Sequence, residues 1–145
     1  MRGQEGDPWK AHVGAVELPP HLGQANKQDE VNRAYIRGLG KQLLEKVFGL
    51  AHEFLNENRD ADNWLLHIEP FDPHEPFFVP EEYQNRYSDD YNGTRFDWPP
   101  YDHVTEPLAA QVHCRNQYGA LLTMCDVYLG KLLDYMDVHQ MWQDT

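Results

Sequence analysis

The chain has 145 residues, which is enough for one compact domain with a core and gives no reason to expect two. Its 12 Lys and Arg against 24 Asp and Glu give a formal net charge of -12, which repels phosphate backbones and anionic lipid headgroups. Nucleic acid and membrane surfaces are therefore poor partners, and any site for an anion must be built locally from a few donors and a cation.

Residues 1–26 are rich in glycine and proline and have no sustained apolar periodicity, so we expect irregular structure there. The N-terminus lacks an apolar signal core, and no apolar run in the chain approaches the roughly 20 residues of a membrane span. We therefore expect a soluble protein. Two cysteines without a CxxC spacing fit a reducing compartment, which favours the cytoplasm.

Residues 27–58 are predicted to be helical, because their apolar positions recur at spacings of three and four. Gly38 and Gly40 are positions at which this helix would split or bend. A polar turn then precedes residues 64–69, whose apolar run is too short for a helix and predicts a buried strand.

Residues 70–104 are predicted to form a long loop, because six prolines exclude regular structure across most of it. Its many aromatic residues indicate core contacts or, alternatively, a carbohydrate-binding platform. A helix over 105–138 follows, with Thr105 as its N-cap. Cys114 and Cys125 lie about 16 Å apart along this helix, so they cannot pair within it, and we expect both to be buried as small apolar residues.

The predicted fold class is α/β, with two long helices around at least one strand plus a long irregular loop, all within a single domain over 1–145. A lone strand would leave its backbone groups unpaired. The chain is therefore expected to sit inside a larger parallel sheet whose faces are covered by helices.

The sharpest cluster of reactive side chains is the segment FDPHEPF, which begins at Phe71 directly after the predicted strand. In open α/β sheets, ligands and catalytic groups concentrate at this end of a strand. Pro73 and Pro76 hold His74, which could donate to an anionic oxygen or act as an acid. The alternative is a structural histidine bonded to a loop carbonyl, and the residue types leave both open.

His67 and Glu69 would share one face of the strand, and Asp72, His74 and Glu75 nearby would permit a metal site. Such groups also arise by chance in a chain with 8 His and 24 acidic residues. No metal ligand is therefore assigned.

Asp126 is interpreted as a helix-terminus or loop partner rather than a catalyst. Cys114 is interpreted as an inert thiol, because the neighbouring Arg115 points in a different direction on a helix. Two acidic pairs in the loop are interpreted as solvated surface, namely Glu81-Glu82 and Asp89-Asp90.

The stretch NWLLHIEPFDPHEPFFVPEEY resembles a sulfatase segment in which a buried strand ends in a Pro-His pair, followed by a Pro and then Pro-x-x-Tyr. The stretch YGALLTMCDVYLGKLLDYMD is similar to the sulfatase helix with a Tyr, a central Asp and a Gly before an aliphatic pair. The resemblance covers residues 40–145. The matching positions are Pro73-His74, Pro76, Pro80 to Tyr83, Tyr118, Asp126, Gly130 and Leu132-Leu133.

The resemblance implies an alkaline phosphatase-like α/β/α sandwich and sulfuric ester hydrolysis, with His74 contacting the sulfate near the ester oxygen. It also implies calcium and a formylglycine, made from the Cys or Ser of a Cys/Ser-x-Pro-x-Arg motif, in the complete enzyme. Neither Cys114 nor Cys125 begins that motif, and the family's metal-binding Asp pair and Asp-His-Gly segment are absent from these residues. We therefore expect an internal fragment that is inactive alone and prone to self-association, taken from an enzyme whose substrate is a sulfate ester.

Two other hypotheses stay open. The chain could be a noncatalytic interaction module that binds a partner through its helices and aromatic loop. It could also belong to a hydrolase of phosphate or phosphonate esters in the same superfamily, because these residues do not distinguish sulfur from phosphorus.

Overall fold

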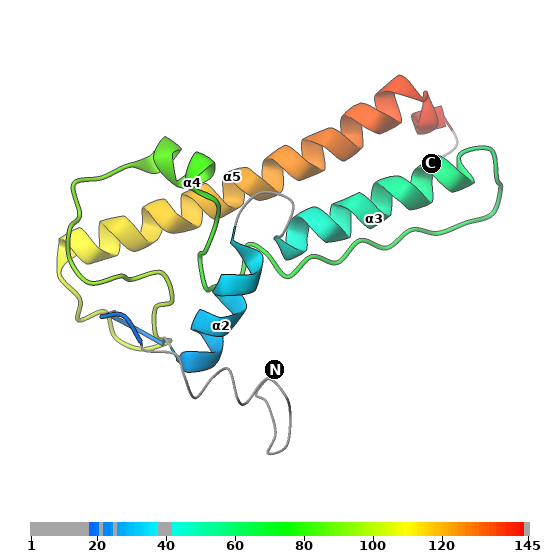
Figure 1. Ribbon diagram of the computed structural model, residues 1–145. Coiled ribbons are helices and arrows are strands. Elements are labelled where there is room, and N and C mark those ends of the chain that lie inside the picture. The colour runs from blue at the N-terminus through cyan, green and yellow to red at the C-terminus, as the bar shows by residue number, and fades with distance from the viewer. Residues whose placement is uncertain (1–17, 21, 25, 38–41, 144–145) are drawn as a thin grey trace, which may run out of the picture.

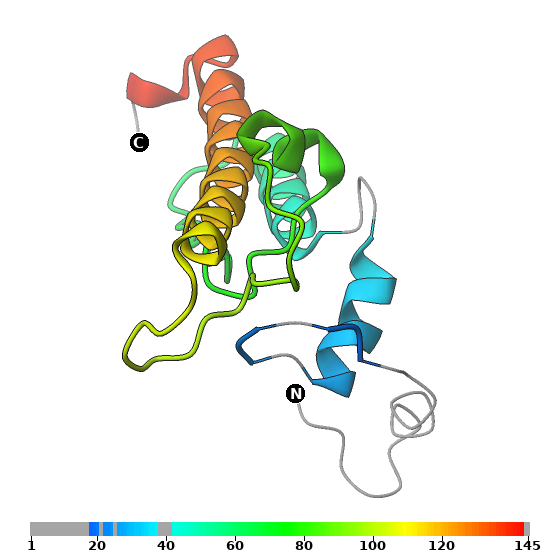
Figure 2. The same cartoon turned by 90° about the vertical axis from the view of Figure 1, so that its left-hand side faces the viewer.

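The computed structural model describes residues 18–20, 22–24, 26–37 and 42–143. Over those residues the chain is mainly helical. The long helices α3 (Leu43–Asn58) and α5 (Leu108–Val138) lie side by side, the short α4 (Glu81–Gln84) rests against α5, and α2 (Lys27–Ile36) is set off from the pair (Figures 1 and 2). Two single-turn 3-10 helices are also present, η1 (Asn85–Tyr87) and η2 (Met141–Gln143).

The core lies between α3 and α5. Buried residues on α3 recur at spacings of four, three and four, which makes one face of a helix, and this face packs on buried residues of α5. That interface accounts for the apolar periodicity of both segments. The residues are Leu44, Phe48, Ala51 and Leu55 from α3, and Ala120, Leu121, Met124 and Leu132 from α5.

A buried carboxylate, Glu45, joins the two helices at the start of α3. One of its oxygens accepts from the backbone N–H of Gln42 at 3.0 Å, which satisfies a donor that a helix start leaves unpaired. The other oxygen accepts from the hydroxyl of Tyr128 on α5. Burial and this hydrogen bond raise the pKa of the Tyr128 phenol, so the hydroxyl stays a donor.

The α/β sandwich predicted from the sequence is wrong, because the described residues contain no sheet. Residues 64–69 are extended, but within the described part of the chain they pair with no neighbouring strand. Among the described residues, backbone hydrogen bonds outside the helices are isolated contacts, such as that of the Leu22 N–H with the Arg95 carbonyl at 2.8 Å. An extended segment becomes a strand only when a neighbour takes up its N–H and C=O groups. The apolar run indicated a buried face and not a pairing partner.

The extended segment packs on the helices through alternate side chains. Trp64, Leu66 and Ile68 contact the core, whereas Leu65 is 91% exposed. The Trp64 ring meets Phe54 of α3 edge to face, with 5.5 Å between ring centroids. The segment therefore runs along the helix pair and leads directly into the FDPHEPF turn.

Helix boundaries depart from the sequence-based expectation mainly at prolines. The helical region expected over 27–58 is divided into α2 and α3, and the two glycines of the expected break lie outside the described residues. α5 begins after Pro107 rather than at Thr105, and α4 begins after Pro80 within the expected loop. Both prolines have a non-helical backbone, with ψ of 145° at Pro107 and 149° at Pro80. Proline breaks a helix when it lies in the helix interior. Here each proline lies just before the first residue of a helix, where it is tolerated.

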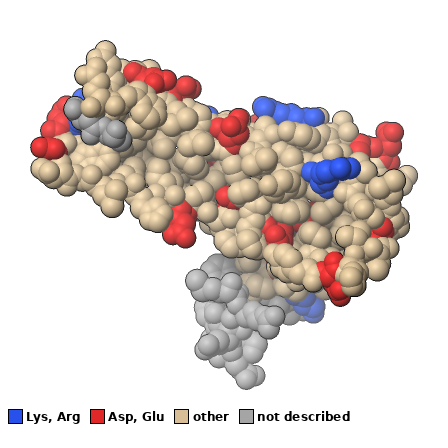
Figure 3. Space-filling model, turned by 180° about the vertical axis from the view of Figure 1, so that it is seen from behind, with Lys and Arg blue, Asp and Glu red and all other residues tan. Residues whose placement is uncertain are grey.

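Acidic side chains are more widespread than basic ones on the face opposite to that of Figure 1. Figure 3 shows them scattered along this face, at both ends and between them, with few Lys and Arg side chains. None of the helices in the described ranges has the length and apolar character needed to cross a membrane.

Candidate functional site

The turn that follows the extended segment carries His74. Its backbone N–H donates to the Phe71 carbonyl at 3.2 Å, and its ring lies 4.4 Å from the Phe71 ring, centroid to centroid. His74 Nδ1 lies 2.9 Å from the carbonyl oxygen of Glu75. The His74 side chain is nevertheless 49% exposed. The imidazole is therefore held on one side and open to solvent on the other.

The contact with the Glu75 carbonyl decides which nitrogen of His74 can meet a ligand. A carbonyl oxygen only accepts, so Nδ1 carries the proton in this arrangement. No hydrogen bond to Nε2 is formed by the described residues. Nε2 accepts in the neutral ring and donates in the imidazolium. The sequence analysis treated a bond to a loop carbonyl and a contact with a ligand as alternatives for His74. The two contacts are compatible, because the first uses Nδ1 and the second would use Nε2.

Negative charge surrounds this turn. Glu75 places Oε2 at 3.5 Å from Nδ1 of His74, and its Oε1 accepts from the Tyr101 hydroxyl. Burial raises the pKa of the neighbouring Asp72 carboxyl. Over the described residues, the Lys and Arg side chains form their ion pairs elsewhere. Protonated His74 is thus the cationic donor that the turn itself offers to an anion.

The residues considered for a metal site are not gathered into one. His67 and Glu69 are exposed on the extended segment. Within the described ranges, no three His, Cys, Asp or Glu side chains lie together in a way that could hold a metal ion. These residues are close in the sequence, but in the described structure they do not form a metal-binding site.

The other residues singled out from the sequence lie on α5. Asp126 is exposed in the middle of the helix, so its interpretation as a helix-terminus or loop partner is wrong. Cys114 is buried, Cys125 is half-buried, and both thiols are free. Burial raises the pKa of each thiol to about 11, which keeps both protonated and unreactive at neutral pH.

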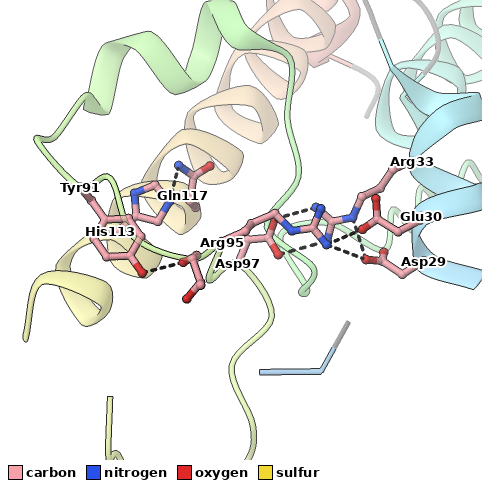
Figure 4. Close-up of polar contacts among 9 residues, drawn as sticks. Asp29, Glu30, Arg33, Tyr91, Arg95, Asp97, His113 and Gln117 are labelled. Atoms are coloured by element: carbon pink, nitrogen blue, oxygen red, sulfur yellow. Dashed lines mark hydrogen bonds and ion pairs between the residues drawn. The ribbon is translucent and has the colours of Figure 1, made fainter. Parts of the chain in front are cut away.

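A buried ion cluster fastens α2 to the loop after η1 (Figure 4). Arg33, only 2% exposed, donates to the two oxygens of Asp97 at 2.6 and 3.1 Å and to Asp29 at 2.8 Å. Burial alone would lower the pKa of the Arg33 guanidinium, but the two carboxylates outweigh it and raise that pKa. The guanidinium carbon also lies 5.0 Å from the centroid of the Phe78 ring.

Asp97 connects this cluster to the turn that carries His74. Its backbone carbonyl accepts from the N–H of Phe77, three residues after His74, at 2.8 Å. Arg95 adds a contact with Glu30 of α2, while its buried Nε has no hydrogen-bond partner among the described residues and lies 3.7 Å from Asp97. The ion cluster therefore anchors the downstream end of the His74 turn.

A second polar cluster joins the loop to α5 (Figure 4). The Asp89 carboxylate lies 3.2 Å from Nδ1 of His113 and accepts from the Asn116 amide at 2.8 Å. The His113 ring stacks on Tyr91, with centroids 4.5 Å apart. Burial on its own would raise the pKa of the Asp89 carboxyl, but hydrogen bonds from Asn116, the Tyr91 backbone and His113 together lower it.

Sequence reasoning missed both clusters because their members are far apart in the chain. Arg33 and Asp97 are separated by 64 residues, and nothing local to either one indicates the other. The interpretation of Asp89 as solvated surface is wrong, because its carboxylate is used by α5. The i,i+4 spacing of Asp29 and Arg33 was the available signal, and it predicts a helical ion pair but not its burial.

Replacing Asp97 by Ala should lower the free energy of unfolding by about 3 kcal/mol, because it leaves Arg33 buried with one carboxylate fewer. Urea unfolding followed by helix circular dichroism measures the change. Asp126→Ala is the control: this carboxylate is exposed on α5, and its removal should cost less than about 0.5 kcal/mol. Equal losses in the two variants would contradict a stabilising role of the Arg33–Asp97 pair.

Replacing Asp89 by Asn should lower the thermal midpoint at neutral pH by a few degrees. Because the pKa of folded Asp89 lies below its ordinary value of 3.8, the stability it contributes is fully present above that value and is lost as the pH falls through the lower, folded-state pKa. The gap between the original chain and the variant should therefore close in acid. The neighbouring, exposed Asp90→Asn is the matched control, and a gap that persists in acid would refute this account.

Residues 18–145 match the sulfatase family model. The match includes His74, both polar clusters and the whole of α5. No curated protein and no solved structure matches the chain.

Proposed function

The chain belongs to the sulfatase family, and from this we propose that His74 contacts the sulfate ester of a sulfuric ester hydrolase, while the 145-residue chain alone does not turn that ester over. The observation that carries the proposal is the half-exposed imidazole of His74, with Nδ1 committed to the Glu75 carbonyl and Nε2 left for a ligand.

Protonated His74 is suited to an ester at the moment of cleavage. In the complete enzyme, its Nε2–H would donate to an oxygen of the sulfate group and pass the proton to the alcohol oxygen as the sulfuryl group moves from that oxygen to a nucleophile that these residues do not supply. The Glu75 carboxylate places Oε2 at 3.5 Å from Nδ1, on the side of the ring away from Nε2. The Phe71 and carbonyl contacts limit the ring's motion, which supports positioning of the donor.

The calcium and the formylglycine implied by the family resemblance do not fit the described residues. Calcium takes about six to eight oxygen ligands, and in the described ranges even three candidate ligands are not gathered together. The two thiols are protonated, and neither Cys114 nor Cys125 begins a Cys-x-Pro-x-Arg motif. We therefore assign no step through either group, and a lone His74 beside Glu75 lacks the charge needed to hold an anion firmly.

The imidazolium of His74 would contact a phosphate or phosphonate ester by the same geometry, because all of these groups present anionic oxygens. Titration of the chain with an aryl phosphate and with a phosphonate monoester, beside nitrophenyl sulfate, distinguishes these substrate classes. If the chain binds a phosphorus ester more tightly than the sulfate ester, and this binding depends on His74, the substrate is a phosphate or phosphonate ester instead.

Replacing His74 by Gln should abolish the binding of nitrophenyl sulfate to the isotope-labelled chain, because Gln cannot supply the imidazolium donor. Binding is followed by nuclear magnetic resonance shifts of the labelled backbone amides. His67→Gln is the matched control, because His67 is exposed on the same stretch of chain but lies outside the turn. Binding that survives in His74→Gln, or that is lost equally in His67→Gln, would rule out the proposed contact.

The chain alone should release no nitrophenol from nitrophenyl sulfate above the rate of a buffer blank, with or without added calcium. The reason is that a single donor stabilises too little of the charge that develops at the transition state. Absorbance of the released phenol measures the rate. Turnover by the original chain that disappears in His74→Gln would overturn the inactivity and make this chain an enzyme in its own right.

A further inference from the structure

Asn92 and Gly93 form an exposed pair in the loop between the two polar clusters. Asp89 precedes the pair and belongs to the cluster on α5, where its carboxylate accepts from an Asn side chain at 2.8 Å. Arg95 follows the pair and belongs to the ion cluster on α2, through its contact with Glu30. A change of the backbone at the exposed pair therefore bears on both clusters.

Tyr91 closes the turn that contains the pair and restricts its second residue to glycine. The Tyr91 hydroxyl donates to the Thr94 carbonyl at 2.6 Å, and the Tyr91 ring stacks on His113 (Figure 4). A Cβ atom on Gly93 would lie 2.7 Å from this ring, closer than real Cβ atoms approach a neighbouring atom. The ring cannot move aside without losing its stacking and its hydrogen bond. The turn therefore requires a residue without a side chain at position 93.

The same glycine leaves Asn92 open to attack by the backbone. Over the part of the chain that the structure describes, neither the Asn92 side-chain amide nor the Gly93 N–H has a hydrogen-bond partner in the protein. With no side chain on Gly93, little hinders the approach of its nitrogen to Cγ of Asn92. Asparagine is among the thermolabile residues, and every other asparagine of this chain is followed by a residue with a side chain.

We infer that Asn92 is a site of spontaneous modification, at which the asparagine is converted to isoaspartate. The Gly93 nitrogen gives up its proton to hydroxide and bonds to Cγ of Asn92. The bond from Cγ to the amide nitrogen breaks, and that nitrogen takes a proton from water and leaves as ammonia. Water then opens the resulting cyclic imide. Opening at the side-chain carbonyl leaves aspartate, whereas opening at the backbone carbonyl leaves isoaspartate, whose main chain runs through Cβ and Cγ.

Conversion to isoaspartate would loosen the turn that Tyr91 closes. It adds one carbon to the backbone between Tyr91 and Thr94, so the hydroxyl and the carbonyl no longer meet at the 2.6 Å of the unmodified turn. It also shifts Asp89 and Arg95 relative to each other, although each is held by a different helix. The modified chain should therefore be less stable than the original chain.

The test incubates the full 145-residue chain at mildly alkaline pH in water enriched with heavy oxygen, both folded and in urea. Each conversion places heavy oxygen in the new carboxyl group, which mass spectrometry of peptides locates. Residue 92 should take up the label in the folded chain as well as in urea. Asn63, which is also exposed but precedes Trp64, should stay unlabelled. Label at residue 92 in urea alone would show that the folded turn protects Asn92 and would overturn the inference, as would equal labelling of Asn63.

Two variants separate the lengthened backbone from the added charge. Asn92→Gln keeps an amide whose cyclic imide forms far more slowly, so its thermal midpoint should survive the incubation, whereas that of the original chain should fall by a few degrees. Freshly prepared Asn92→Asp carries the new charge without the extra backbone carbon, and it should melt close to the unmodified chain because residue 92 is exposed. An unchanged midpoint in the converted chain, or an equal fall in Asn92→Asp, would contradict loosening by the lengthened backbone.

Discussion

The arrangement of this chain depends on Asp97, because this residue and its neighbour Phe96 together hold three separate segments. Its carboxylate neutralises Arg33 and so fixes α2, and its carbonyl fixes the Phe77 end of the histidine turn. Its neighbour Phe96 is buried against Cys114 of α5. A loop rich in proline cannot secure itself by a regular hydrogen-bond ladder, so a charged residue with few but strong contacts does this instead.

Local physics made some of this structure predictable from sequence and left the rest out of reach. Apolar spacing located the interface of α3 and α5, since each residue of the pattern reports its own environment. It also located the apolar face at residues 64–69, but strand pairing depends on a neighbour that an apolar run does not encode. The buried Arg33–Asp97 pair had no local signal at all. At His74, the flanking prolines indicated a rigid turn. The sequence could not show that Nδ1 bonds to the Glu75 carbonyl and leaves Nε2 for a ligand, because this depends on the three-dimensional arrangement.

The electrostatics of the molecule make ester recognition a balance between opposing terms. A charge of -12 opposes the approach of any anion, and the Glu75 carboxylate beside His74 adds to that opposition. The hydrogen-bond donors that hold an anion at the His74 turn must therefore act at short range, against the field of the molecule as a whole.

Buried and exposed side chains alternate along residues 64–69, and this alternation limits how the length of the segment can change. Trp64, Leu66 and Ile68 face the helices, and His67 and Glu69 face away from the core. Inserting or deleting one residue within this segment would exchange the two faces for the residues on one side of the change and turn polar side chains towards the apolar core, whereas a change of two residues would restore the pattern. A change of two residues in the length of this segment should therefore be tolerated better than a change of one. The number of residues in the segment also sets where the turn that carries His74 begins.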